Sequence, residues 1–113
     1  MNKNFKNIKN FVELKGDVAL IHINRAGFEH IAIVDREDLT LIDLSVKNRL
    51  NIDTNGYVQH KEMINGTYKV FQLHRKIAGA FDWEEIGFYN GNKLDLRKKN
   101  LFYKFDGKIR SVL

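Results

Sequence analysis

The chain has 113 residues, a formal net charge of +5 at neutral pH, and neither cysteine nor proline. This length suits a single domain, and 43% hydrophobic with 29% charged residues is typical of a folded soluble protein. The composition excludes disulfides, thiol nucleophiles and cysteine-ligated zinc, while the lack of an apolar run of roughly 20 residues and of a signal peptide favours a cytosolic location without a membrane partner.

The first half is predicted to contain a β-hairpin followed by a short helix. The polar residues 1–10 are expected to be flexible. Val and Ile are frequent in 17–23 and 30–34, which predicts two strands joined through the turn residues between them. Asp35 can cap a short helix in the segment 35–50, although the spacing of the apolar residues from Leu39 to Val46 fits a helix only in part.

The middle and the end of the chain alternate between turn signals and strand formers. Asn-Gly pairs at 55 and 65 predict hairpin turns, with strands near 57–62 and 67–72. Leu73, Ile77 and Phe81 recur every four residues, which predicts a short helix. Further strands are expected at 83–89 and 100–105. We therefore predict a single α+β domain over residues 1–113, with antiparallel hairpins, short helices and a β-rich part at 11–72.

One ordered set of residues in the second half of the chain is a more specific indication of a protein family than the composition of the chain. It comprises Leu73-His74-Arg75, the stretch "NGNKLD" at 90–95, Arg97 and Asn100-Leu101. This order resembles phage and intron-encoded HNH endonucleases, in which Gly-Tyr and Leu-His-Arg precede Asp-His-x-Asn-Gly-Asn-x-x-Asp-Asn-Arg-x-x-Asn-Leu. The resemblance covers about residues 11–101. It implies that 73–113 form a degenerate HNH part, a ββα-metal-like hairpin that lacks most of its final helix.

The resemblance also implies that the working groups of such a nuclease are missing here. The metal-binding aspartate position is Gly87, the general-base position is Phe88, and one asparagine position is Leu96. The distal metal ligand would fall near Ile109. In the family the base activates water and the metal stabilises the departing oxygen. We therefore expect an inactive relative with no catalytic residue, no metal and no cofactor.

The motif residues that survive are expected to support the fold, and they are His74, Gly91, Asp95 and Asn100. Gly91 allows a tight turn, while Asp95 and Asn100 can satisfy polar groups of the loop. His74 is expected to be a hydrogen-bonded structural residue. Phe88 and Tyr89 are expected to fill the vacated pocket or to pack beside Trp83, and the alternative is a base-stacking role.

The excess of positive charge lies in the second part of the chain. Residues 1–68 hold nine Lys or Arg and nine Asp or Glu, whereas residues 69–113 hold ten and five. Such an excess favours a polyanion or an acidic protein surface as partner, although it can also be a solvated lysine face. The candidate contact residues for a partner or nucleic acid are Arg75, Lys76, Lys93, Arg97, Lys98, Lys99 and Lys104.

Three functions are consistent with these features. The first is a catalytically inactive, phage-encoded inhibitor of the anti-CRISPR type, which docks on a host CRISPR effector nuclease or its nucleic-acid complex; this step is an analogy. The second is a DNA-binding accessory protein that does not cut. The third is a residual metal-dependent nickase in which His74 or His60 replaces the base.

Overall fold

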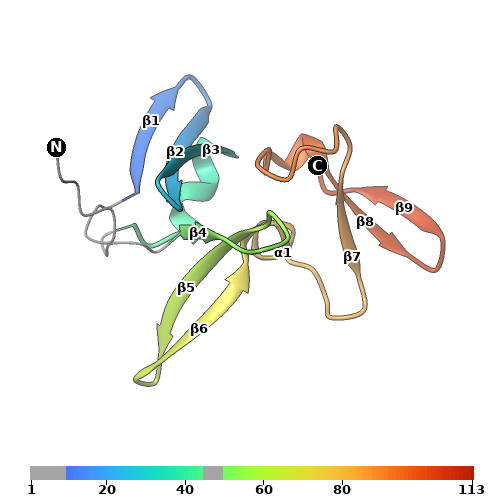
Figure 1. Cartoon of the computed structure of the whole chain (residues 1–113). Coiled ribbons are helices and arrows are strands. Elements are labelled where there is room, and N and C mark those ends of the chain that lie inside the picture. Colours follow the sequence, from blue (N-terminus) through green and yellow to red (C-terminus); the bar gives the residue numbers. More distant parts are fainter. Residues whose placement is uncertain (1–9, 45–49) are drawn as a thin grey trace, which may run out of the picture.

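The computed structural model describes residues 10–44 and 50–113. Residues 1–9 of the segment predicted to be flexible, and Val46 of the predicted helix, lie outside this part of the chain. Most of the described residues belong to three antiparallel sheets of three strands each, in the orders β1–β2–β3, β4–β5–β6 and β7–β8–β9 (Figure 1).

The first sheet supplies much of the core. It consists of β1 (Phe11–Lys15), β2 (Val18–Arg25) and β3 (Phe28–Asp35). Alternate residues of β2 and β3 face inward because side chains in a strand point to opposite sides in turn. The buried residues on that face are Ala19, Ile21, Ile23, Ala32 and Val34. The predicted hairpin is thus correct, whereas the sequence patterns gave no indication of β1.

The second sheet consists of β4 (Leu50–Ile52), β5 (Val58–Ile64) and β6 (Thr67–Gln72). Asn65 and Gly66 connect β5 to β6 as the two central residues of a tight hairpin turn, both with positive φ. This is the conformation that Asn-Gly favours, and the predicted hairpin is confirmed. Only Val58 and His60 of β5 are buried, so the distal half of the hairpin extends away from the core (Figure 1).

The only α-helix among the described residues, α1 (Leu73–Ala78), connects the second sheet to the third. Leu73 and Ile77 are buried on one face, as the four-residue spacing predicts. The helix is shorter than expected because Gly79 ends it in the left-handed conformation, with φ of 63°. Phe81 therefore lies beyond the helix and is exposed.

The helix predicted after Asp35 is wrong in type and length. A six-residue 3₁₀-helix, η2 (Arg36–Leu41), is found instead. The Asp35 carboxylate makes no capping bond to it and accepts the backbone N–H of Lys98 at 2.9 Å. The Asp35 side chain, which was expected to cap a helix, is thus engaged in a hydrogen bond to a residue far away in the sequence.

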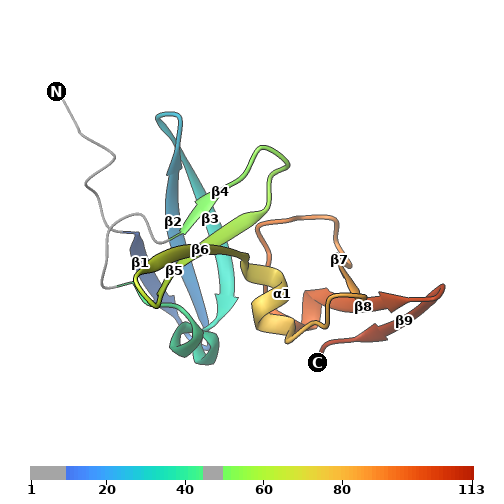
Figure 2. The ribbon, with the colours of Figure 1, turned by 90° about the horizontal axis from the view of Figure 1, so that it is seen from below.

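The third sheet lies beyond α1 and consists of β7 (Glu85–Phe88), β8 (Leu101–Phe105) and β9 (Lys108–Ser111) (Figure 2). A short 3₁₀-helix, η3 (Lys98–Asn100), precedes β8. The two predicted strands at 83–89 and 100–105 are present with trimmed ends. β9 occupies the region where the resemblance expects the distal metal ligand and its helix.

The three sheets share one hydrophobic core. Inward residues of β2 and β3 pack with Leu50 and Val58 of the second sheet, with α1, and with Leu96 and Leu101. Residues 94–96 extend the first sheet, since Ile33 donates its N–H to Leu94 O at 2.8 Å and accepts the N–H of Leu96 at 2.7 Å. The molecule is therefore a small, mostly β domain with short helices, and the helical share of the predicted α+β class is minor.

No helix in the described ranges is both long enough and apolar enough to cross a bilayer.

Candidate functional site

Gly87 lies opposite Phe102 in the β7–β8 pair, and the Phe102 ring covers it. A Cβ atom placed on Gly87 would lie 2.2 Å from Phe102 Cζ and within 2.7 Å of two more ring carbons. The space that an aspartate would need is therefore filled by an aromatic ring. This arrangement explains the glycine without any appeal to backbone flexibility, because its φ is not positive.

Phe88 belongs to an aromatic cluster that also contains Tyr57 and His74. The Phe88 ring centroid is 5.2 Å from that of His74 and 6.4 Å from that of Tyr57, and the Tyr57 and His74 rings stack at 5.0 Å. The ammonium of Lys93 lies 4.6 Å above the Tyr57 ring and completes the cluster. Phe88 thus packs within this cluster, whereas Trp83 stacks on Phe81.

His74 is buried in this cluster, with 4% of its surface exposed. Burial, followed by the nearby charge of Arg75, lowers the pKa of His74 to about 4, so its imidazole is neutral at neutral pH. Its Nδ1 atom has no hydrogen-bond partner among the described residues. The expected hydrogen-bonded role is therefore not found for this atom, and the ring contributes mainly by stacking.

The loop between β7 and β8 is held by a compact network of side-chain hydrogen bonds. Asn100 Oδ1 accepts the Asn90 N–H at 3.0 Å, and Asn100 Nδ2 donates to Asn90 Oδ1 and to the Asp95 carbonyl, both at 2.9 Å. Asn90 Nδ2 donates to Asp95 Oδ2 at 3.0 Å. Gly91 adopts a φ of 74°, as a tight turn requires. These three polar side chains connect the two ends of the loop.

Asp95 has a second partner that neutralises its charge. Arg97 donates through Nε to Oδ1 at 2.8 Å and through a terminal nitrogen to Oδ2 at 2.6 Å. These bonds outweigh burial and hold the pKa of Asp95 below its ordinary value, while the same contact raises the pKa of Arg97. The bidentate geometry favours a structural role for Arg97 and reduces its availability for a partner.

Four more of the predicted contact residues also bind within the chain. Arg75 donates to the carbonyls of Glu84 at 2.6 Å and Phe81 at 2.8 Å, and Lys76 forms an ion pair with Glu62. Lys93 donates to the Asn55 carbonyl at 2.8 Å. Lys98 binds the buried carboxylate of Asp38 at 2.8 Å, and this bond is the main cause of its raised pKa.

Lys99 and Lys104 are exposed and form neither an ion pair nor a side-chain hydrogen bond among the described residues. Arg110 lies nearby in β9, where it stacks on the Tyr103 ring and approaches Glu84 at 3.4 Å. Most of the basic residues predicted to contact a partner are therefore engaged within the chain. Sequence spacing could not show this, because the acceptors lie up to about 60 residues away.

Leu96 and Ile109 occupy two further positions at which the family carries polar residues. Leu96 is fully buried in the core, where an asparagine would lack solvent. Ile109 is exposed on β9, an edge strand of the third sheet. In the described ranges, no group of three or more His, Cys, Asp or Glu side chains has a geometry that could hold a metal ion.

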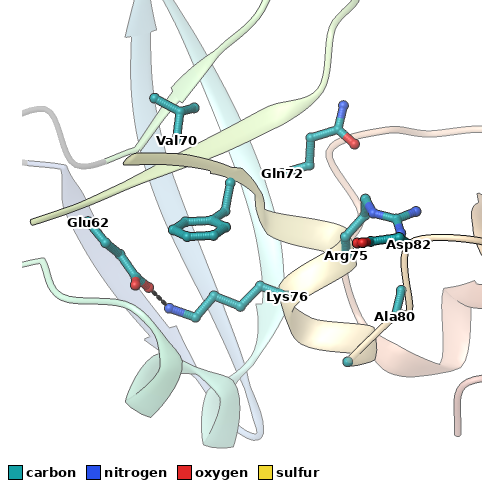
Figure 3. A pocket seen from close by; sticks show the side chains of 9 residues that line it. Glu62, Val70, Gln72, Arg75, Lys76, Ala80 and Asp82 are labelled. Carbon is teal, nitrogen blue, oxygen red and sulfur yellow. Dashed lines mark ion pairs between the residues drawn. The ribbon is translucent and has the colours of Figure 1, made fainter. Parts of the chain in front are cut away.

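A groove lies between β6 and α1, and its lining includes no residue of the β7–β8 loop (Figure 3). Its volume is about 480 Å³. Val70, Phe71 and Gln72 form one side, and Arg75, Lys76, Gly79 and Ala80 form much of the other. The Glu62–Lys76 ion pair closes one end. Sequence analysis missed this groove, since it depends on how the helix turns back beside the strand.

Comparison of the chain with protein-family models, with curated proteins and with solved structures finds no match.

Proposed function

We propose that the protein is a catalytically inactive relative of HNH endonucleases that acts by binding another macromolecule. The supporting observation is the filling of the two positions that would carry the metal ligand and the base. The Phe102 ring fills the space beside Gly87, and Phe88 packs against Tyr57 and His74. Hydrophobic packing at both positions stabilises the fold and leaves no group there that could activate water.

The loop network fits the same proposal. Asn90, Asp95 and Asn100 bond to one another or to the loop backbone, so their polar atoms hold the frame of the motif together. A loop that keeps its hydrogen-bonded structure without catalytic groups can still serve as a surface that binds another macromolecule. We propose a host CRISPR effector nuclease, or its complex with nucleic acid, as the partner, by analogy with other small inhibitory proteins.

The test is inhibition of purified effector nucleases. DNA cleavage by a panel of CRISPR effectors is measured with an increasing excess of the protein, and at least one effector is expected to be inhibited. If all of them cut normally at a large excess, this partner class is wrong. A parallel plasmid-nicking assay with Mg²⁺, Mn²⁺ or Zn²⁺ should give no product, and a nick that the His74→Ala variant fails to make would contradict the inactive assignment.

The DNA-binding alternative has weaker support. Five of the seven basic candidates bond within the chain, which leaves Lys99 and Lys104 as the pair without such bonds among the described residues. Non-specific DNA affinity rises with the number of phosphates contacted, so we expect little binding at physiological salt. A gel-shift titration at low and moderate salt measures this. Tight binding that the Lys99→Gln/Lys104→Gln variant loses would favour the alternative.

A further inference from the structure

β6 is an edge strand whose outer side is open. It pairs with β5 on one side only, and no backbone hydrogen bond in the described part of the chain joins its other side. Five of its six residues are exposed, including Tyr68 at 55%, Val70 at 51% and Phe71 at 38%. An edge of this kind presents a row of donors and acceptors that a further strand can use.

Edge strands β9 and β1 are better protected against such pairing. β9 carries Lys108 and Arg110 within four residues, and β1 carries Glu13 and Lys15 within five. Charged side chains discourage the addition of a strand at an edge. β6 has a single charge, Lys69, among residues that otherwise favour strands.

Lys69 lacks a carboxylate partner among the described residues. Its neighbour in register on β5 is Glu62, which would be its natural cross-strand partner. The Glu62 carboxylate instead binds Lys76 of α1 and lies 3.2 Å from His60 Nδ1. The charge of Lys69 therefore remains available on the open edge, and an incoming strand could supply the missing carboxylate.

The groove described above begins where β6 ends, and Val70, Phe71 and Gln72 line it (Figure 3). Lys69 and Phe71 point to the same side of the sheet, since they are two residues apart. A strand added to β6 would thus place one side chain beside Lys69 and another, two residues away, over Phe71 at the groove. Peptides that extend a sheet gain affinity from backbone bonds and specificity from such alternate positions.

We propose that the open edge of β6 and the adjoining groove form a docking site for an extended segment of a partner protein. That segment carries a carboxylate that pairs with Lys69 and an apolar side chain that packs on Phe71. The inference deepens the proposed function, and it rests on that function for the partner being a macromolecule. The inference places the contact with the partner protein on the β5–β6 hairpin and not on the basic residues predicted from the sequence.

A second copy of the chain satisfies this site less well. In a twofold antiparallel pairing of β6 with itself, the register centred on Lys69 opposes two like charges, which is destabilising. The register centred on Val70 places Lys69 opposite Phe71 of the other copy, so no carboxylate meets the lysine. Charge complementarity therefore favours a different, acidic strand over self-association.

The test uses a fluorescent synthetic peptide, acetyl-Thr-Val-Thr-Glu-Thr-Val-Thr-amide, and measures its anisotropy with the full chain. Saturable binding is expected, with loss of binding when alternate peptide nitrogens are methylated, because methylation removes the backbone donors. Lys69→Glu should weaken binding about fivefold and should favour the same peptide with lysine in place of glutamate. Lys15→Glu, an exposed lysine on edge strand β1, is the matched control and should bind as the wild type does.

Three results would overturn this inference. They are the absence of saturable binding at millimolar peptide, equal binding of the methylated peptide, and an unchanged charge preference in Lys69→Glu. Sedimentation that shows a dimer disrupted by the peptide would assign the edge to a second copy and would also reject the inference. The nuclease-inhibition assay uses the wild-type chain without peptide, so the proposed function can fail or succeed separately.

Discussion

Gly87→Ala is predicted to destabilise the protein although glycine-to-alanine changes in strands usually do the reverse. The backbone at this position is accessible to alanine, so the change alone would stabilise by about 0.4–1 kcal/mol through the unfolded state. The new Cβ, however, would lie 2.2 Å from Phe102 Cζ, whereas ordinary van der Waals contacts of a Cβ atom begin at about 3.4 Å. The ring must move, and overpacking of this kind costs about 1–3 kcal/mol. We expect a net loss of about 1 kcal/mol.

A double-mutant cycle with Phe102→Ala isolates the steric cause. Removal of this half-buried ring alone should cost about 1–2 kcal/mol through lost packing. In the Gly87→Ala/Phe102→Ala variant the clash is absent, so the second substitution should no longer destabilise and should instead stabilise by about 0.4–1 kcal/mol through the unfolded state. The coupling between the two sites is then about 2 kcal/mol, well above the few tenths found for independent sites. Urea unfolding followed by circular dichroism measures all four proteins, and Phe105→Ala, an exposed ring on the same strand, serves as the control.

Two outcomes would refute this reasoning. If Gly87→Ala is as stable as the wild type, the ring does not occupy the space above Gly87. If the double variant loses the sum of the two single losses, Gly87 is needed for a reason other than the ring. Either result would also remove the main support for the inactive assignment of this site.

Three further predictions concern buried polar groups. Asp95→Asn should lower the free energy of unfolding by about 2 kcal/mol at pH 7, because a charge-assisted hydrogen bond is lost. Since the folded-state pKa of Asp95 is depressed, the difference in unfolding free energy between the variant and the wild type should shrink as the pH falls through that pKa. His74 has a folded-state pKa of about 4 against 6.5 unfolded, so its stability contribution is full above pH 6.5 and declines by up to about 3 kcal/mol as the pH falls to 4; in His74→Phe this slope should be absent from unfolding curves measured at each pH. Lys98→Ala leaves the buried Asp38 carboxylate without its cation and should lower the unfolding free energy by about 3 kcal/mol, whereas the exposed Lys99→Ala should change it by less than about 0.5 kcal/mol; equal effects in thermal unfolding would argue against an energetic role for the pair.

Local signals in the sequence predicted several elements well. The Asn-Gly pair at 65 specifies the β5–β6 hairpin, since few other residues adopt two consecutive positive φ values at low cost. The spacing of Leu73 and Ile77 identified the buried face of α1. The roles of Asp95 and Asn100 within the loop also follow from residue type, because short polar side chains in a tight loop bond to nearby backbone.

Other elements depended on distant partners and could not be predicted. Asp35 has the residue type of a helix cap, yet it binds the backbone of Lys98. β1 and β9 lack clear alternation and form because β2 and β8 offer them an edge. In the sequence Arg97 and Lys98 look like free surface cations. In the fold each pairs with a buried carboxylate, of Asp95 or Asp38, because a buried carboxylate requires a cation nearby.

The sequence by itself determined the turns, the alternation of the central strands, and the presence of Gly87 and Phe88 where the HNH resemblance expects an acid and a base. These follow from backbone preferences and from the chemistry of single side chains. Only the tertiary structure decided which cations are engaged within the chain, that the Phe102 ring covers Gly87, and that β6 has an open edge beside a groove. Each of these depends on residues far apart in the chain, because burial and pairing are properties of the packed whole.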